Sequence, residues 1–287
     1  MSQMTQLEHA LDTTEAYVAH FESQSLPVLK RTVRELDTLR EDEESVSGRR
    51  IAAVILGDPL MAMRVISFLE RKRGATQNHD ITTVDRAVMM MGITPFFREF
   101  YNLPIVEDLL AKRPKALIGL LQVIGRARRA AHFARDWAIL RHDLDVDEIT
   151  LAALLREATE ILCWCFAPVL TEKVYAMQKA DPTLRSVVAQ REVFGFTAQE
   201  IQSALVKAWR LPALLVSLMN EADAENPRVQ TVALAAALAR HSAHGWTDPA
   251  LPDDFEAIGT LVHMGREPLL KRLGLTPEEA APYLPLP

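Results

Sequence analysis

Residues 51–66 read Ile51-Ala-Ala-Val-Ile-Leu-Gly-Asp58-Pro59-Leu-Met-Ala-Met-Arg-Val-Ile66, and this stretch decides the fold. Asp58 is suited to cap a helix, because its carboxylate accepts hydrogen bonds from the free amides of a first turn. Pro59 suits the first helical position, where its missing N–H costs nothing. A helix is therefore expected from Leu60 to about residue 71, preceded by another that Ser47 caps.

Apolar residues recur at the helical period along nearly the whole chain, and no stretch alternates convincingly with period two. The sequence therefore predicts an all-α fold. Further helices are expected at residues 5–22, from Leu26-Pro27 onward, from Thr82 or Thr83 to Gly92, from Thr94-Pro95 onward, at 114–140 and at 148–166.

The composition is that of an ordinary helical protein, with 49% apolar and 6% aromatic residues in a chain of 287. Its formal net charge of −6 argues against a nucleic-acid partner. The N-terminus lacks the features of a signal peptide, and the longest apolar run, residues 116–125, is too short to span a membrane. We expect a cytoplasmic protein with no membrane segment, in which Cys163 and Cys165 are buried free thiols.

Four parts of the chain together resemble a known family. The stretch 51–66 follows Leu26-Pro27 and precedes Ile81-Thr-Thr-Val-Asp-Arg-Ala-Val-Met-Met-Met-Gly92. The second half contains Phe194-Gly-Phe-Thr-Ala-Gln-Glu-Ile-Gln-Ser-Ala-Leu-Val-Lys-Ala-Trp-Arg-Leu-Pro212. These segments are similar to the signatures of the HDOD domain, a relative of the HD metal phosphohydrolases.

The resemblance implies an HDOD-type helical domain of two lobes over residues 23–245. The N-terminal lobe is expected at 23–112 and the HD-like lobe at 113–245. Residues 1–22 are expected to form a separate N-terminal helix, and residues 246–287 to form C-terminal helices and a Pro-rich tail.

This chain departs from the HD enzymes at the positions of the metal ligands. Where the resemblance places the His-Asp pair, the chain has Arg156-Glu157. A guanidinium is permanently cationic and has no lone pair to give to a metal. A second ligand position, where the family has a His, holds Ala198. The position of a late Asp ligand falls at or near Ala236, and the segment from Asn220 to Asp223, where another pair is expected, lacks a His. The resemblance therefore implies a retained fold with degenerate HD positions and no cofactor.

Other histidines provide weaker candidates for a metal site. His142-Asp143 is a literal His-Asp pair, but it lies in a charged segment before a helix and is expected to be a solvated turn. His241 and His244 have the i, i+3 spacing of metal ligands. The turns before them supply no carboxylate, and a helix C-terminus also favours cationic His, which explains the pair without a metal.

A basic stretch, residues 112–141, carries eight basic residues and one acidic residue. Its arginines could grip the phosphates of a nucleotide bidentately, together with Arg156. The alternative is that they pair with acidic residues elsewhere in the chain, notably at 41–44 or 143–147. The candidate anion-binding residues are Arg126, Arg128, Arg129, Arg135 and Arg156.

The leading hypothesis is a non-catalytic HDOD regulatory or scaffold protein that binds a protein partner in bacterial signal transduction. The resemblance supports it, because many HDOD proteins lack a complete metal set. Two alternatives stay open: a metal-dependent phosphohydrolase with a non-standard ligand set, and a nucleotide-sensing module that uses the arginines. The sequence does not decide whether the chain forms a homodimer.

Overall fold

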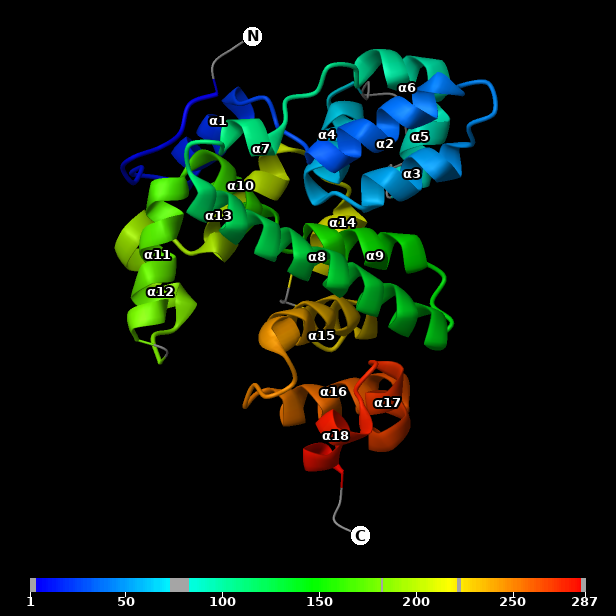
Figure 1. Ribbon diagram of the computed structural model, residues 1–287, viewed down its shortest axis with the longest axis vertical. Coiled ribbons are helices and arrows are strands. Elements are labelled where there is room, and N and C mark those ends of the chain that lie inside the picture. Colours follow the sequence, from blue (N-terminus) through cyan, green and yellow to red (C-terminus); the bar gives the residue numbers. More distant parts are fainter. Residues whose placement is uncertain (1–3, 73–82, 182, 221–222, 285–287) are drawn as a thin grey trace. The chain divides into compact units, whose positions relative to one another are not determined.

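Helices form the regular structure of the computed structural model, which describes residues 4–72, 83–181, 183–220 and 223–284 (Figure 1). This confirms the all-α prediction. The described residues contain no strand, and their one β-type pairing is an isolated parallel bridge between Val28 and Ile105. Within the same residues, no helix is both long and apolar enough to cross a membrane.

The chain forms two compact units, and the first comprises residues 1–125 and 157–213. Its helices are α1 (Thr14–Ser23), α2 (Lys30–Glu41), α3 (Gly48–Leu56), α4 (Pro59–Lys72), α5 (Val84–Met91), α6 (Ile93–Glu99), α7 (Val106–Leu109), the first part of α8 (Pro114–Leu140), α10 (Ala158–Phe166), α11 (Pro168–Ala180), α12 (Ser186–Phe194) and α13 (Ala198–Ala208).

The second unit comprises residues 126–156 and 214–287. It contains the rest of α8, then α9 (Val146–Leu155), α14 (Ala213–Met219), α15 (Pro227–His241), the 3₁₀ turn η2 (Ser242–His244), α16 (Leu251–Val262), α17 (Arg266–Arg272), α18 (Pro277–Ala280) and the 3₁₀ turn η3 (Ala281–Tyr283). The helix α15 packs against both α9 and α16 (Figure 1), and about half of its residues are therefore buried.

These units are divided differently from the lobes 23–112 and 113–245 that the resemblance implies. The reason is packing between distant segments: α1 packs on α13, and α10 packs on α4. The Tyr17 hydroxyl donates a hydrogen bond to the carbonyl of Phe194 over 2.9 Å. The helices α10 to α13 therefore belong with the N-terminal segment.

The first predicted helix, residues 5–22, is wrong in its first half, because α1 begins only at Thr14. Thr13 caps it by accepting a hydrogen bond from the Ala16 amide over 3.1 Å. The amides before it have other acceptors: the Leu7 amide donates to the Phe166 carbonyl over 2.6 Å. The Leu11 amide donates to the Tyr17 hydroxyl over 3.0 Å. Tertiary hydrogen bonds thus hold this segment outside the helix.

The helix expected from Leu26-Pro27 also begins later, at Lys30. Val28 forms the isolated bridge instead: its amide donates to the Pro104 carbonyl over 2.8 Å, and its carbonyl accepts from the Val106 amide over 2.9 Å.

The other predicted helix boundaries have mixed outcomes. Thr83 caps α5, and Gly92 ends this helix with φ of 81°. Thr82, the alternative cap, lies outside the described residues. Ser47 stands at the N-cap of α3 without a side-chain hydrogen bond to it.

Asp58 is fully buried and connects the starts of two helices. Oδ1 accepts hydrogen bonds from the amides of Leu60 (2.9 Å) and Met61 (3.4 Å) in the first turn of α4. Oδ2 accepts from the Leu29 amide (2.8 Å) and the Thr32 hydroxyl (2.7 Å) at the start of α2. Burial raises the pKa of the Asp58 carboxyl, and these hydrogen bonds lower it in part.

Gly119 lies where α8 meets the indole ring of the buried Trp164 within the first unit. A Cβ atom at this position would lie 2.5 Å from Cζ2 of Trp164, well inside van der Waals contact. Gly125 lies two turns further along α8 and is exposed, and a Cβ there would meet nothing within 4 Å. Close packing explains the first glycine and does not explain the second.

We expect Asp58→Ala to lower the free energy of unfolding by about 3 kcal/mol or more, because it leaves two buried donors without an acceptor and also removes a cap. Thr13→Ala, which removes an ordinary exposed cap, is expected to cost only about 1 kcal/mol. Urea denaturation followed by circular dichroism measures both values. Equal losses in the two variants would contradict the role given to Asp58.

Gly119→Ala is expected to lower the free energy of unfolding by about 1–3 kcal/mol, because the new methyl group overlaps the Trp164 ring. Gly125→Ala is the matched control in the same helix, and we expect it to stabilise by about 0.5–1 kcal/mol, since Ala is the better helix former. Thermal denaturation of the two variants provides the comparison. A stabilising Gly119→Ala would show that the packing against Trp164 is not as described.

Candidate functional site

Arg156 and Glu157 stand at a break in the chain's helical structure. The single helix predicted at 148–166 is wrong, because α9 ends at Leu155 and α10 begins at Ala158. Glu157 has φ of −95° and ψ of 17°, outside the helical region. The Arg156 amide donates to the carbonyl of Ala153, three residues earlier, as in a tight last turn. The chain passes from the second unit to the first between these two residues.

The Arg156 guanidinium has a structural partner within its own unit. Its Nη1 donates a hydrogen bond to the carbonyl of Met219, the last residue of α14. The last carbonyls of a helix accept no hydrogen bond from an N–H group of the same helix. A cationic donor such as a guanidinium therefore stabilises them. Arg156 thus stabilises the end of α14 from the position where the resemblance places the metal-binding His.

The other degenerate HD positions also lack metal-ligand chemistry. Ala198 is the first residue of α13, and its amide donates to Oε1 of Gln190 over 2.9 Å. It follows Thr197, which forms a reciprocal capping box with Glu200. Ala236 is buried on α15, with 4% of its surface exposed. Neither alanine can donate an electron pair to a metal from its side chain.

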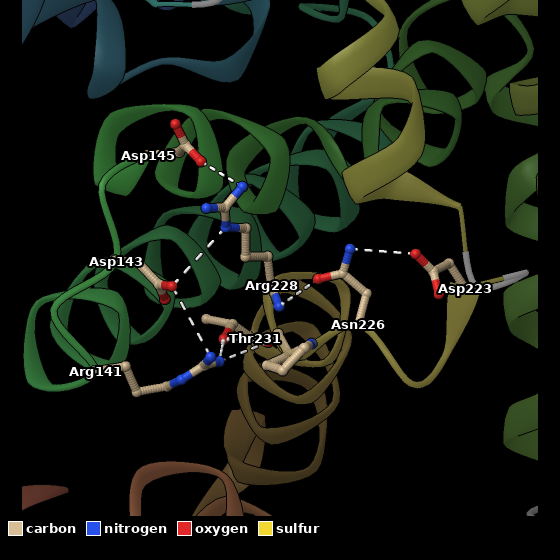
Figure 2. Close-up of polar contacts among 8 residues, drawn as sticks. Arg141, Asp143, Asp145, Asp223, Asn226, Arg228 and Thr231 are labelled. Atoms are coloured by element: carbon tan, nitrogen blue, oxygen red, sulfur yellow. Dashed lines mark hydrogen bonds and ion pairs between the residues drawn. The ribbon is translucent and has the colours of Figure 1, made fainter.

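Asp223 and Asn220 complete the set of positions taken from the resemblance. Asp223 is exposed, and its carboxylate accepts a hydrogen bond from the Asn226 side-chain amide over 3.2 Å (Figure 2). The Asn220 amide donates to the Ser217 carbonyl over 3.2 Å. Residues 221 and 222 lie outside the described part of the chain. The positions do not fit the metal centre of an HD enzyme.

The remaining candidates for a metal site also fall short of a ligand set. His241 does have a carboxylate partner, Asp254 of α16, with Nδ1 and Oδ2 2.6 Å apart. His244 is exposed in η2, and His142 is exposed in a turn with φ of 58°. Across the described ranges, no three His, Cys, Asp or Glu side chains lie close enough together to hold a metal ion.

Cys163 and Cys165 are free and buried, as the sequence predicts. Burial raises the pKa of both thiols well above the usual range, so both are protonated at neutral pH. A nucleophilic or metal-binding cysteine needs the thiolate. The two thiols are therefore core residues.

Several arginines of the basic stretch have partners within the second unit. Arg129 donates to the carbonyls of Ala239 (2.9 Å) and Ser242 (3.4 Å) at the end of α15. Burial, together with the neighbouring charge of Arg126, lowers the pKa of the Arg129 guanidinium. Arg135 forms an ion pair with Asp147 over 2.7 Å. Pairing with acidic residues at 143–147 is the alternative to nucleotide binding that the sequence analysis gives for these arginines.

A polar cluster joins the turn after α8 to the start of α15 (Figure 2). Arg228 lies between two carboxylates, 2.5 Å from Oδ2 of Asp145 and 3.9 Å from Oδ1 of Asp143. Arg141 approaches Asp143 within 3.8 Å and donates to the Pro227 carbonyl (2.8 Å) and the Thr231 hydroxyl (3.2 Å). Two guanidiniums thus balance two carboxylates, which leaves no excess charge to attract an ion.

An open groove of about 970 Å³ lies beside this cluster, along α15 and α16. Arg141 and residues near the start of α15 contribute to its lining. Apolar residues supply most of the remaining lining, and the carboxylates of Asp253 and Glu256 stand on the α16 side. The lining includes Val229, Gln230, Ala233, Leu234, Ala257, Thr260, Leu261 and His263.

The sequence interpretation missed this groove and the pairing of His241 with Asp254. Both join residues of α15 to residues of α16. The helix α16 lies within residues 246–287, for which the sequence predicts C-terminal helices and a tail and no functional site. The i, i+3, i+4 spacing of the α16 residues 253, 256, 257 and 260 is the only signal that could have indicated an exposed face.

The chain folds into two all-helical units, and Arg156 stands where the resemblance to the HDOD family places a metal-binding His. The HDOD domain family matches residues 26–225, which is more than half of the chain. The chain therefore belongs to the HDOD domain family. No curated protein matches it.

Solved structures show the same fold. A response regulator, MmoQ, from Methylococcus capsulatus strain Bath is 19% identical, with a TM-score of 0.63, over 88% of this chain and 99% of its own. A virulence factor from Campylobacter jejuni is 18% identical, with a TM-score of 0.63, over 95% of this chain and 96% of its own. At these identities the likeness establishes a common fold.

Proposed function

We propose that this chain is a non-catalytic HDOD regulatory protein that acts in the bacterial cytoplasm by binding a protein partner in a signal-transduction pathway. The observation that carries the proposal is the donor chemistry at the HD positions. Metal-assisted hydrolysis of a phosphate ester needs several His and carboxylate ligands around one or two ions. Here those positions hold Arg156, Glu157, Ala198 and Ala236.

These residues have structural uses that a metal centre would not permit. The Arg156 guanidinium is directed to the Met219 carbonyl, and a cation at this position would repel a metal ion. Ala236 belongs to the core of the second unit. Glu157 alone offers a single carboxylate. The fold is retained while the residues that would perform hydrolysis are absent.

Two further observations favour regulation by partner binding. The MmoQ protein, similar in fold, is described as a response regulator, which places that relative in signalling. The second unit also presents an open, mostly apolar groove suited to a macromolecular partner. The nucleotide-sensing alternative has less support, because Arg129, Arg135 and Arg156 donate to partners within their own unit.

We expect the tagged chain, produced at its native level and reversibly crosslinked in its own cells, to retain a specific protein in stoichiometric amount. Quantitative mass spectrometry measures the enrichment. Asp58→Ala is the matched control: a partner that recognises the folded surface will decrease, whereas chaperones that bind exposed apolar segments will increase.

The opposite pattern would contradict the proposal. In that case the wild-type chain retains only proteins that the Asp58→Ala variant retains equally well. Turnover of a phosphodiester by the purified wild-type chain, lost on Glu157→Ala, would point to the hydrolase alternative instead.

A further inference from the structure

The groove on the second unit has an apolar floor built at helical spacing. Val229, Ala233 and Leu234 of α15 line one side, and Ala257 and Leu261 of α16 line the other. Positions four residues apart, such as 229 and 233 or 257 and 261, are neighbours on one face of a helix. The two helices pack against each other (Figure 1), and apolar residues from both line the same groove.

The groove is open, and its outer lip is acidic. Asp253, Glu256, Ala257 and Thr260 are all exposed on α16, while Phe255, Ile258 and Val262 of the same helix are buried on its inner side. Asp253 and Glu256 are i, i+3 neighbours and therefore direct two carboxylates along the same lip.

Among the described residues that line the groove, Arg141 is the only Lys or Arg. Its guanidinium lies 3.8 Å from the Asp143 carboxylate and donates to the Pro227 carbonyl and the Thr231 hydroxyl. The remaining titratable residue in the lining is His263, exposed with φ of 53°. The groove therefore combines an apolar floor with a negatively charged edge.

We propose that this groove binds an amphipathic helix of a protein partner that carries apolar side chains on one face and Lys or Arg residues beside them. The proposal deepens the proposed function and rests on it. A helix laid in an apolar groove buries side chains at i, i+3, i+4 and i+7. Its basic residues would meet Asp253 and Glu256, which gives orientation and selectivity more than affinity.

The dimensions of the groove favour a helix over a compact small molecule. The α16 residues that line it span 253–261, which corresponds to about 13 Å at 1.5 Å per residue, or roughly two and a half turns of a ligand helix. A small-molecule site usually encloses most of its ligand, whereas this lining is largely exposed along α16. A helix needs only one face buried.

The groove is also a property of this chain beyond its family match. The match ends at residue 225, and all of the floor residues named above lie between 229 and 261. The family match therefore does not cover the floor of the groove.

Fluorescence anisotropy with two labelled peptides tests the proposal. Both are about 14 residues long, roughly four helical turns, with Leu at i, i+3, i+4 and i+7. One carries Lys beside the Leu face, and the other carries Glu at the same positions. We expect the Lys peptide to bind the full-length chain at least about tenfold more tightly, and this preference to shrink in high salt.

Three variants locate the binding. The double variant Asp253→Asn/Glu256→Gln should remove most of the preference for the Lys peptide without altering the shape of the groove. Ala257→Arg, which places a long cationic side chain in the groove at an exposed position, should abolish binding. The matched control, Glu267→Gln/Glu278→Gln, removes two exposed charges outside the groove lining and should have no effect.

The groove assignment is overturned by any of three results: neither peptide binds up to about 1 mM, the two peptides bind equally, or Ala257→Arg leaves binding intact. If a specific partner is still recovered from cells in those cases, the proposed function stands and the partner binds elsewhere. If no partner is recovered and no peptide binds, both proposals fail.

Discussion

The structure of the first unit depends on a buried carboxylate. Asp58 accepts four hydrogen bonds, two from the first turn of α4 and two from the start of α2, and no part of it is exposed. A buried ionisable group is costly unless its hydrogen bonds are made. The Asp-Pro signature of the family therefore specifies more than a helix start, because it fixes the entry of one helix against another.

The same reasoning separates fold from chemistry at the HD positions. None of the four residues there contributes to the buried Asp58 contacts, so they could change without loss of the framework. The residues present at these positions have local structural roles: Arg156 donates to the end of α14, and Ala198 starts α13 behind a capping box. Glu157 stands where the helical structure breaks and the chain passes between the two units. The Asp58 hydrogen bonds that hold the first unit thus do not involve the residues at the HD positions.

Sequence reasoning succeeded where the signal is local. The start of α4 at Pro59, the cap at Thr83 and the end of α5 at Gly92 follow from the hydrogen-bonding and backbone preferences of those residues. It failed where distant partners decide the conformation. Residues 5–13 have the helical pattern, but the carbonyl of Phe166 and the hydroxyl of Tyr17 take amides that a helix would need. The break at 156–157 and the pairing of His241 with Asp254 depend in the same way on packing. The groove could not be predicted because its two walls meet only in the folded second unit.

The central claim is that the chain keeps the HD-related fold without its metal chemistry, and elemental analysis tests it most directly. The chain is purified from its native cells without a chelator, and iron, manganese, zinc and magnesium are measured by inductively coupled plasma mass spectrometry. The account predicts well below one metal ion per chain, unchanged by Glu157→Ala. One or more tightly bound ions per chain, lost on Glu157→Ala, would contradict it.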